Sequence, residues 1–189
     1  MTAAMLWNIL DWTWIASEVV ILAATRTRRS SGNVRDRGSL LILWPVIVAS
    51  MTAASWIGEA HAPTMFGGAR WVRTASLAIL VIGLAIRWAA IATLGKAFSA
   101  NVAIHATQTV HKTGLFRFVR HPSYSGLMLI FVATGLHTRN WVGLAVALLP
   151  TTAALLYRIH VEEAALGEAF GQEYIDYSRA TKRLFPGIY

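Results

Sequence analysis

About five apolar stretches constrain this 189-residue chain more than any other feature of its sequence. Each approaches the ~20 residues that a helix needs to cross a hydrocarbon layer about 30 Å thick. The stretches cover residues 3–24, 40–57, 74–94, 123–136 and 141–157. The sequence therefore predicts an all-α, polytopic membrane protein with about five transmembrane helices.

The last two stretches are joined only by residues 137–140, so they must be antiparallel neighbours and predict a tight helical hairpin. Residues 123–136 are short for a bilayer, and we expect this helix to tilt, to sit shallow or to border a polar cavity. Residues 158–180 carry an apolar stripe, which predicts a cytoplasmic C-terminal amphipathic helix. We interpret the chain as a single membrane domain, with N-terminal spans in residues 1–60 and a core in residues 72–189.

The composition favours a membrane protein over a nucleic-acid-binding one. The chain has 17 Lys and Arg against 9 Asp and Glu, a net charge of +8, yet 56% of its residues are hydrophobic and only 14% are charged. A soluble nucleic-acid-binding domain would hold its basic residues on a far less apolar body, so we expect no nucleic-acid partner. The absence of cysteine excludes a disulfide framework, a Cys-ligated zinc site and a thiol nucleophile.

The distribution of Lys and Arg predicts the orientation in the membrane. One side of the predicted bundle carries Arg70, Arg73 and Arg139. The opposite side carries a longer set, namely Arg26, Arg28, Arg29, Arg35, Arg37, Lys96, Lys112, Arg117, Arg120, Arg158, Arg179, Lys182 and Arg183. We therefore place the N-terminus outside and the C-terminus in the cytoplasm, and we expect a bacterial inner membrane. Each basic residue near the surface adds about 1 kcal/mol of attraction to anionic lipids.

The most informative motif runs from Arg117 to Gly126. Pro122 suits the first turn of a helix, where its missing N–H needs no partner. A helix N-terminus offers free N–H groups to an anionic ligand, and here Arg120 and His121 precede it while Tyr124 lies about one turn inside. The alternative interpretation is a basic interfacial anchor with an aromatic belt residue.

Two further segments hold candidate site residues. Arg158 and Glu162 are four residues apart, so they share a helix face, and the short hairpin brings that face near His121. The alternative for them is an ordinary surface pair contributing about 0.3–0.5 kcal/mol. The polar loop from Asn101 to Phe116 permits backbone contacts to a small ligand, although its composition would serve any loop.

Some polar residues point to no site. The histidines His61, His105 and His137 lack any repeated metal-ligand spacing, so we predict no metal. Asp11 and Glu18 lie inside a predicted span without a partner that the sequence identifies. We interpret Arg87, in the third span, as structural.

The sequence resembles the isoprenylcysteine carboxyl methyltransferase family of integral membrane methyltransferases. The central phrase of the resemblance is Arg120-His121-Pro122-Ser123-Tyr124-Ser125-Gly126. The match extends over about the last hundred residues, through Leu94-Gly95, Phe98-Ser99, Gly114, Arg158, Glu162-Glu163, Gly171–Tyr177 and Arg183–Pro186. The first two spans match only as hydrophobic helices.

The resemblance implies that S-adenosylmethionine binds in a cytoplasm-facing pocket of the core, and that a lipophilic small-molecule or lipidated acceptor enters from the bilayer. It implies a catalytic role for Arg158 and Glu162, with Arg158 facing the acceptor. The implied cofactor contacts are Asn101, Gln108, Thr109, Val110, His111, Phe116, His121, Pro122, Ser123, Tyr124 and Glu162. His111 stands where the family usually has an aliphatic residue, and Phe116 where a tyrosine is common.

The chemistry of these residues fits methyl transfer, an in-line displacement that depends mainly on positioning and exclusion of water. A carboxylate acceptor is already ionised at neutral pH and needs no general base. Arg158 could hold it bidentately, while Glu162 fixes the guanidinium or the cofactor. An amine acceptor would need a base, and His121, His111 or Glu162 could each serve.

Four functions remain open at this point. The first is carboxyl methylation of a prenylcysteine-like acceptor, and the second is phospholipid or amine N-methylation. The third is a sterol-reductase-like enzyme using NADPH, although the chain lacks a Gly-rich dinucleotide fingerprint. The fourth is a non-catalytic membrane scaffold or transporter subunit, although the chain lacks an inverted repeat.

Overall fold

The computed structural model of the protein describes residues 2–25, 33–34, 38–60, 64–65, 69–99, 103–104 and 109–189. Several residues named above lie outside the described part of the chain: Asn101, Gln108, His61, His105 and the arginines between residues 26 and 37. The expectations for those residues stay predictions.

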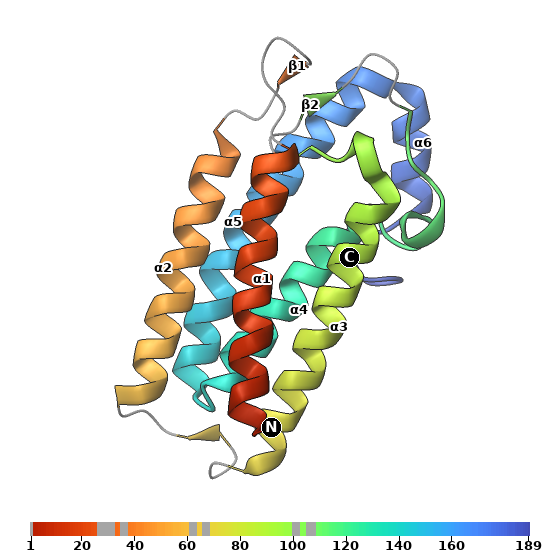
Figure 1. Ribbon diagram of the computed structural model, residues 1–189. Coiled ribbons are helices and arrows are strands. Elements are labelled where there is room, and N and C mark those ends of the chain that lie inside the picture. Colours follow the sequence, from red (N-terminus) through yellow and green to blue (C-terminus); the bar gives the residue numbers. More distant parts are fainter. Residues whose placement is uncertain are drawn as a thin grey trace.

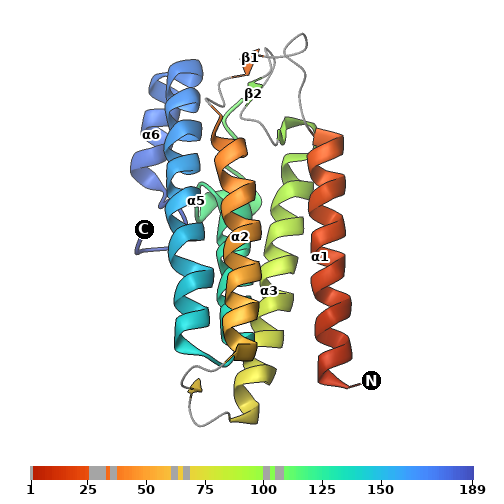
Figure 2. The same cartoon turned by 90° about the vertical axis from the view of Figure 1, so that its left-hand side faces the viewer.

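Long helices running along a common axis make up the fold (Figures 1 and 2). The helices are α1 (Ala3–Thr25), α2 (Ser39–Ala60), α3 (Arg70–Leu94), α4 (Pro122–His137), α5 (Trp141–Phe170) and α6 (Gln172–Ala180), with short 3-10 turns η2 (Gly95–Ala97) and η3 (Gly114–Arg117). Two strands of two residues each, β1 (Asn33–Val34) and β2 (Ala103–Ile104), pair antiparallel near one end of the bundle. The prediction of an all-α membrane fold is confirmed.

Among the described residues, α1, α2, α3 and α5 are long and apolar enough to cross a membrane. The fifth predicted span, α4, has 16 residues and starts well inside the bundle (Figure 1). In Figure 1, α4 begins lower than the upper ends of α3 and α5. Whether α4 itself counts as a crossing stays a prediction.

The single helix predicted for residues 158–180 is wrong. Helix α5 continues unbroken from Trp141 to Phe170, and a separate α6 begins at Gln172. Polarity rises after Tyr157, but Glu, Ala and Leu in the following turns favour a helix, so the backbone has no reason to stop. The break comes at Gly171, whose φ of 53° suits glycine and ends the helix.

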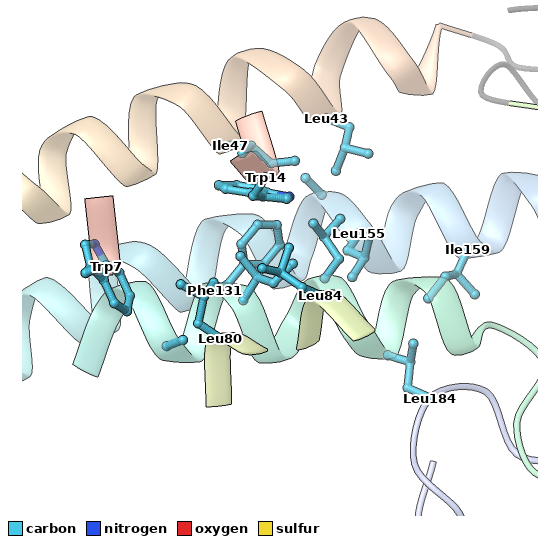
Figure 3. Close-up of a cluster of buried hydrophobic side chains, with 14 residues drawn as sticks. Trp7, Trp14, Leu43, Ile47, Leu80, Leu84, Phe131, Leu155, Ile159 and Leu184 are labelled. Atoms are coloured by element: carbon cyan, nitrogen blue, oxygen red, sulfur yellow. The ribbon is translucent and has the colours of Figure 1, made fainter. Parts of the chain in front are cut away.

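The core lies between the helices, where large apolar side chains surround Phe131 of α4 (Figure 3). Trp14 of α1, Ile47 of α2 and Leu155 of α5 are all buried there. In contrast, the outward faces of the bundle expose side chains such as Trp12, which is 69% exposed. A water-soluble protein rarely exposes so much apolar surface, whereas a lipid environment favours it.

Helices α3 and α4 cross at two glycines. A Cβ atom on Gly126 would lie 2.6 Å from the carbonyl oxygen of Gly83, and one on Gly83 would lie 2.8 Å from that of Gly126. Any larger residue would push the helices apart, so the glycines permit the backbones to touch. This close crossing brings Arg87 of α3 against the first turn of α4 at Ser123, where its Nη1 atom donates a 3.0 Å hydrogen bond to the Ser123 hydroxyl.

Candidate active site

A cavity of about 110 Å³ lies where α4 begins, between that first turn, the last part of α5, and α6. Its walls include nine of the residues predicted to contact a cofactor: Thr109, Val110, His111, Phe116, His121, Pro122, Ser123, Tyr124 and Glu162. These residues come from two separate parts of the chain, residues 109–124 and the position of Glu162 in α5. The start of α4 and the loop before it lie opposite α5 because the tight α4–α5 hairpin holds the two helices together.

The structure adds residues that the sequence did not single out as cofactor contacts. Tyr174 and Tyr177 of α6, Phe170 of α5, and Phe98 also line this cavity. The regular spacing of the two tyrosines in a segment included in the family resemblance was the available signal. The Gly171–Tyr177 segment belongs to the family resemblance, but the resemblance alone assigns neither tyrosine to the cavity wall.

A second cavity of about 40 Å³ adjoins the first, between α1, α2, α3 and α5. Its lining is mostly apolar, and its polar members include Arg158, Arg87 and Glu18. Both cavities are lined by Phe98, Ser99 and Tyr124, so these residues form a shared wall. Glu162 therefore lines the larger cavity together with His121, whereas Arg158, one turn earlier on α5, lines the smaller cavity.

Tyr124 links the two predicted catalytic residues at this shared wall. Its hydroxyl donates a 2.7 Å hydrogen bond to Oε2 of Glu162 and accepts a 3.2 Å hydrogen bond from Nε of Arg158. Arg158 is 3% exposed and also donates to the Ser39 hydroxyl across 2.8 Å. The hydrogen bonds hold the Glu162 carboxylate at the larger cavity and the Arg158 guanidinium at the smaller one.

Glu163, the neighbour of Glu162, anchors the C-terminal segment to the start of α4. Its carboxylate accepts hydrogen bonds from Nε of Arg120 and Nε of Arg183, both at 2.9 Å, and lies 3.3 Å from Nε2 of His121. In addition, the backbone N–H of His121 donates to the carbonyl of Arg183 across 3.0 Å. Residues 181–184 are thereby held against the start of α4.

The two tyrosines of α6 differ in their hydrogen bonding. Tyr177 donates a 2.6 Å hydrogen bond to the carbonyl oxygen of Phe116, and burial raises the pKa of its phenol to about 12. Tyr174 is 6% exposed, and its buried hydroxyl has no hydrogen-bond partner among the described residues. Burial also raises the pKa of Tyr174, so its hydroxyl keeps its proton and remains a hydrogen-bond donor on a side chain that lines the larger cavity.

The charged residues inside the spans have clear positions. Glu18 and Arg87 form a buried ion pair, so the Arg87 side chain does not extend to the membrane surface. His137 stacks on Trp7 at 3.7 Å between ring centroids, at the end of the bundle away from the cavities. Among the described residues, His, Asp and Glu side chains form no cluster that could hold a metal ion.

Comparison with known proteins identifies relatives of the chain. The model of the isoprenylcysteine carboxyl methyltransferase family matches residues 76–168. A protein of Oryza sativa subsp. indica named "Probable protein-S-isoprenylcysteine O-methyltransferase" is 30% identical over 91% of this chain and 90% of its own length. Protein-S-isoprenylcysteine O-methyltransferase A of Arabidopsis thaliana is 32% identical over 62% of this chain and 61% of its own.

The fold is also found among solved structures. The structure of a eukaryotic intramembrane Ras methyltransferase superimposes with a TM-score of 0.62 at 24% identity, covering 77% of this chain and 52% of that one. This likeness concerns the fold. Since the rice relative matches across nearly the whole of both sequences and the family model covers α4 with most of α3 and α5, the chain belongs to the isoprenylcysteine carboxyl methyltransferase family.

Proposed function

We propose that the protein transfers a methyl group from S-adenosylmethionine to the carboxylate of a prenylcysteine-like acceptor at the cytoplasmic face of the membrane. The relatives are named for this reaction on isoprenylated cysteine. The observation that carries the proposal is the meeting at Tyr124 of a larger cavity lined by Glu162 and a smaller one lined by Arg158 and aliphatic side chains. A methyltransferase with a lipid-like acceptor needs two adjoining binding sites, one for the polar methyl donor and one for the lipophilic acceptor.

The chemistry of the larger cavity fits the cofactor. S-Adenosylmethionine combines a sulfonium cation, an amino acid and a nucleoside. Glu162 offers a carboxylate to its cationic groups, and the Tyr174 hydroxyl offers a donor that lacks a protein partner among the described residues. A buried polar group without a partner costs about 1–3 kcal/mol, which a bound ligand can recover.

The residues proposed to hold the cofactor are those implied by the family resemblance. Nine of them line the larger cavity, and Asn101 and Gln108 belong to the part of the chain that the structure does not describe. When bound, the cofactor supplies a methyl group on a positively charged sulfur. The protein contributes by orienting the two reactants and by excluding water from the space between them.

Arg158 is proposed to bind the acceptor carboxylate. Its planar guanidinium matches a carboxylate bidentately and stays charged even when buried. Because the carboxylate is ionised at neutral pH, no protein group has to remove a proton. The hydrogen bond from Arg158 to Tyr124, and from Tyr124 to Glu162, then sets the position of the acceptor relative to the cofactor side.

The smaller cavity is proposed to receive the start of the prenyl chain. Leu43 and Ile47 of α2 and Leu22 of α1 contribute apolar walls beside Arg158. An apolar chain gains about 0.8 kcal/mol for each CH₂ group that it buries. Lipophilic acceptors therefore bind better here than their short-chain analogues.

The orientation of the protein follows from its basic residues. Among the described residues, the segments around the larger cavity and directly after α6 hold Lys112, Arg117, Arg179 and Lys182, whereas the start of α3 and the α4–α5 link hold Arg70, Arg73 and Arg139. The positive-inside rule then supports a cytoplasmic site and an external N-terminus. The bacterial inner membrane stays a prediction, and the relatives named above come from plants.

The test is a methyl-transfer assay in one membrane preparation with labelled S-adenosylmethionine and three acceptors. These are an N-acetylated S-prenylcysteine, its carboxamide, and phosphatidylethanolamine. We expect label in a base-labile ester of the prenylcysteine alone. Label in the carboxamide or in an N-methylated phospholipid would contradict carboxyl methylation.

A further inference from the structure

A buried ion pair joins α1 to the α3–α4 crossing. Glu18 is 2% exposed and Arg87 6%, and both guanidinium and carboxylate lie deep among apolar side chains. Trp14 of α1 donates a 3.0 Å hydrogen bond from its indole to Oε1 of Glu18. Trp14 and Glu18, one turn apart on α1, thus both take part in the contact with Arg87.

Arg87 extends the contact to the cofactor side. Its Nη1 atom donates to the Ser123 hydroxyl at 3.0 Å and to the Ser123 carbonyl oxygen at 3.4 Å. Ser123 lies in the first turn of α4 and lines the larger cavity, while Arg87 itself lines the smaller one. Only Ser123 therefore lies between the Arg87 guanidinium and the larger cavity.

The positive charge of Arg87 lies close enough to the larger cavity to repel a cationic ligand bound there. The first turn of a helix carries the positive end of its dipole, and Arg87 adds a full positive charge that cannot be removed by deprotonation. Electrostatic effects in a low-dielectric interior reach further than in water. The carboxylate of Glu18 is the group that balances this charge.

We propose that Glu18 and Arg87 act together as a positioning and charge-balancing pair for the cofactor cavity. Arg87 holds the first turn of α4 through Ser123, and Glu18 cancels the repulsion that Arg87 would exert on a sulfonium. The inference rests on the proposed function, because it requires a positively charged donor. Neither residue touches the reacting atoms.

Arg87 and Glu18 differ in the charge that each keeps when the other is substituted. A buried arginine stays charged, whereas a buried glutamate without its partner takes up a proton and becomes neutral. Glu18→Gln therefore leaves an uncompensated cation beside the cavity. Arg87→Gln leaves no net charge, but it removes the hydrogen bonds to Ser123.

The experiment measures the dissociation constants of S-adenosylmethionine and of its thioether product, S-adenosylhomocysteine, by titration calorimetry on purified full-length protein. The two ligands differ in the sulfonium charge. For Glu18→Gln we expect the dissociation constant of S-adenosylmethionine to rise about tenfold more than that of the thioether, the order of effect of one uncompensated charge in a protein interior. For Arg87→Gln we expect both to rise by the same factor, severalfold.

Ser17→Ala is the matched control. Ser17 lies next to Glu18 and accepts a 3.2 Å hydrogen bond from the indole of Trp88, the neighbour of Arg87. The variant removes an uncharged contact between the same two helices. We expect it to leave the ratio of the two dissociation constants unchanged.

The outcomes separate this inference from the proposed function. If the wild-type protein binds neither ligand, the proposed function and the inference both fail. If the wild type binds both, and Glu18→Gln weakens both equally or neither, the charge balance is refuted while the proposed function stands. Arg87→Gln carries the test should Glu18→Gln not yield folded protein, and wild-type affinity in that variant overturns the positioning role.

Discussion

The Tyr124 hydroxyl donates a 2.7 Å hydrogen bond to the carboxylate of Glu162, across the wall that separates the two cavities of the site. The same hydroxyl accepts a hydrogen bond from Arg158. A phenol is suited to this place because it can donate to one charged group while it accepts from another. Phenylalanine would keep the ring but could do neither.

We therefore expect Tyr124→Phe to lower the kcat/KM for the prenylcysteine acceptor by about tenfold to a hundredfold, since a hydrogen bond to a charged group contributes about 1.5–3 kcal/mol. A radiometric methyl-transfer assay measures the change. Tyr157→Phe is the matched control, because Tyr157 is 41% exposed and lines neither cavity. A Tyr124→Phe enzyme within twofold of the wild type would show that the link is not used.

Arg158 is expected to separate acceptor binding from cofactor binding. Arg158→Ala should abolish turnover while it changes the dissociation constant of S-adenosylmethionine by less than about threefold, because the guanidinium lines the smaller cavity and not the larger one. Arg158→Lys keeps the charge without the bidentate geometry, so we expect partial activity with a raised KM for the acceptor. Near-normal turnover in Arg158→Ala would contradict the acceptor-binding role.

The parts of this fold that the sequence predicts are local. The span over residues 3–24, the α4–α5 hairpin and the helix start at Pro122 follow from hydropathy, a short link and a proline, which act within a few residues. The end of α5 was misplaced for the same reason. The apolar stretch ends at Tyr157, but a helix that leaves the membrane needs no break there, and α5 continues to Phe170.

The parts that the sequence does not predict are pairings between distant residues. Glu18 and Arg87 are costly to bury singly, but one sequence does not show that they meet, because the contact depends on how α1 packs against α3. The same holds for Glu163 and its contact with Arg183. The division of the site into two cavities depends on which way the Arg158 side chain points, and periodicity alone does not give that direction.

Tyr174→Phe tests whether the Tyr174 hydroxyl forms a hydrogen bond to the bound cofactor. Removing a buried hydroxyl that has no partner among the described residues should leave the melting temperature without ligand unchanged or raise it. The dissociation constant of S-adenosylmethionine should rise about threefold to tenfold, as loss of one hydrogen bond of about 0.5–1.5 kcal/mol implies.

Tyr177→Phe is the control for that measurement. Tyr177 lies on the same helix but already donates to the carbonyl of Phe116, so its variant should lower the melting temperature, by an amount that corresponds to about 1 kcal/mol. In the absence of ligand, Tyr177→Phe should therefore lower the melting temperature and Tyr174→Phe should not. A Tyr174→Phe protein that binds the cofactor as tightly as the wild type would exclude the Tyr174 hydroxyl from the cofactor site.

The close crossing of α3 and α4 predicts that adding one methyl group at Gly126 destabilises the fold. In Gly126→Ala the new Cβ would meet the Gly83 carbonyl at 2.6 Å, so we expect a loss of about 1–3 kcal/mol in stability and a weaker contact between Arg87 and Ser123. Gly167→Ala in α5 meets no atom within 4 Å and should gain about 0.5–1 kcal/mol from helix propensity. Thermal unfolding in one detergent measures both, and equal melting temperatures would refute the close crossing.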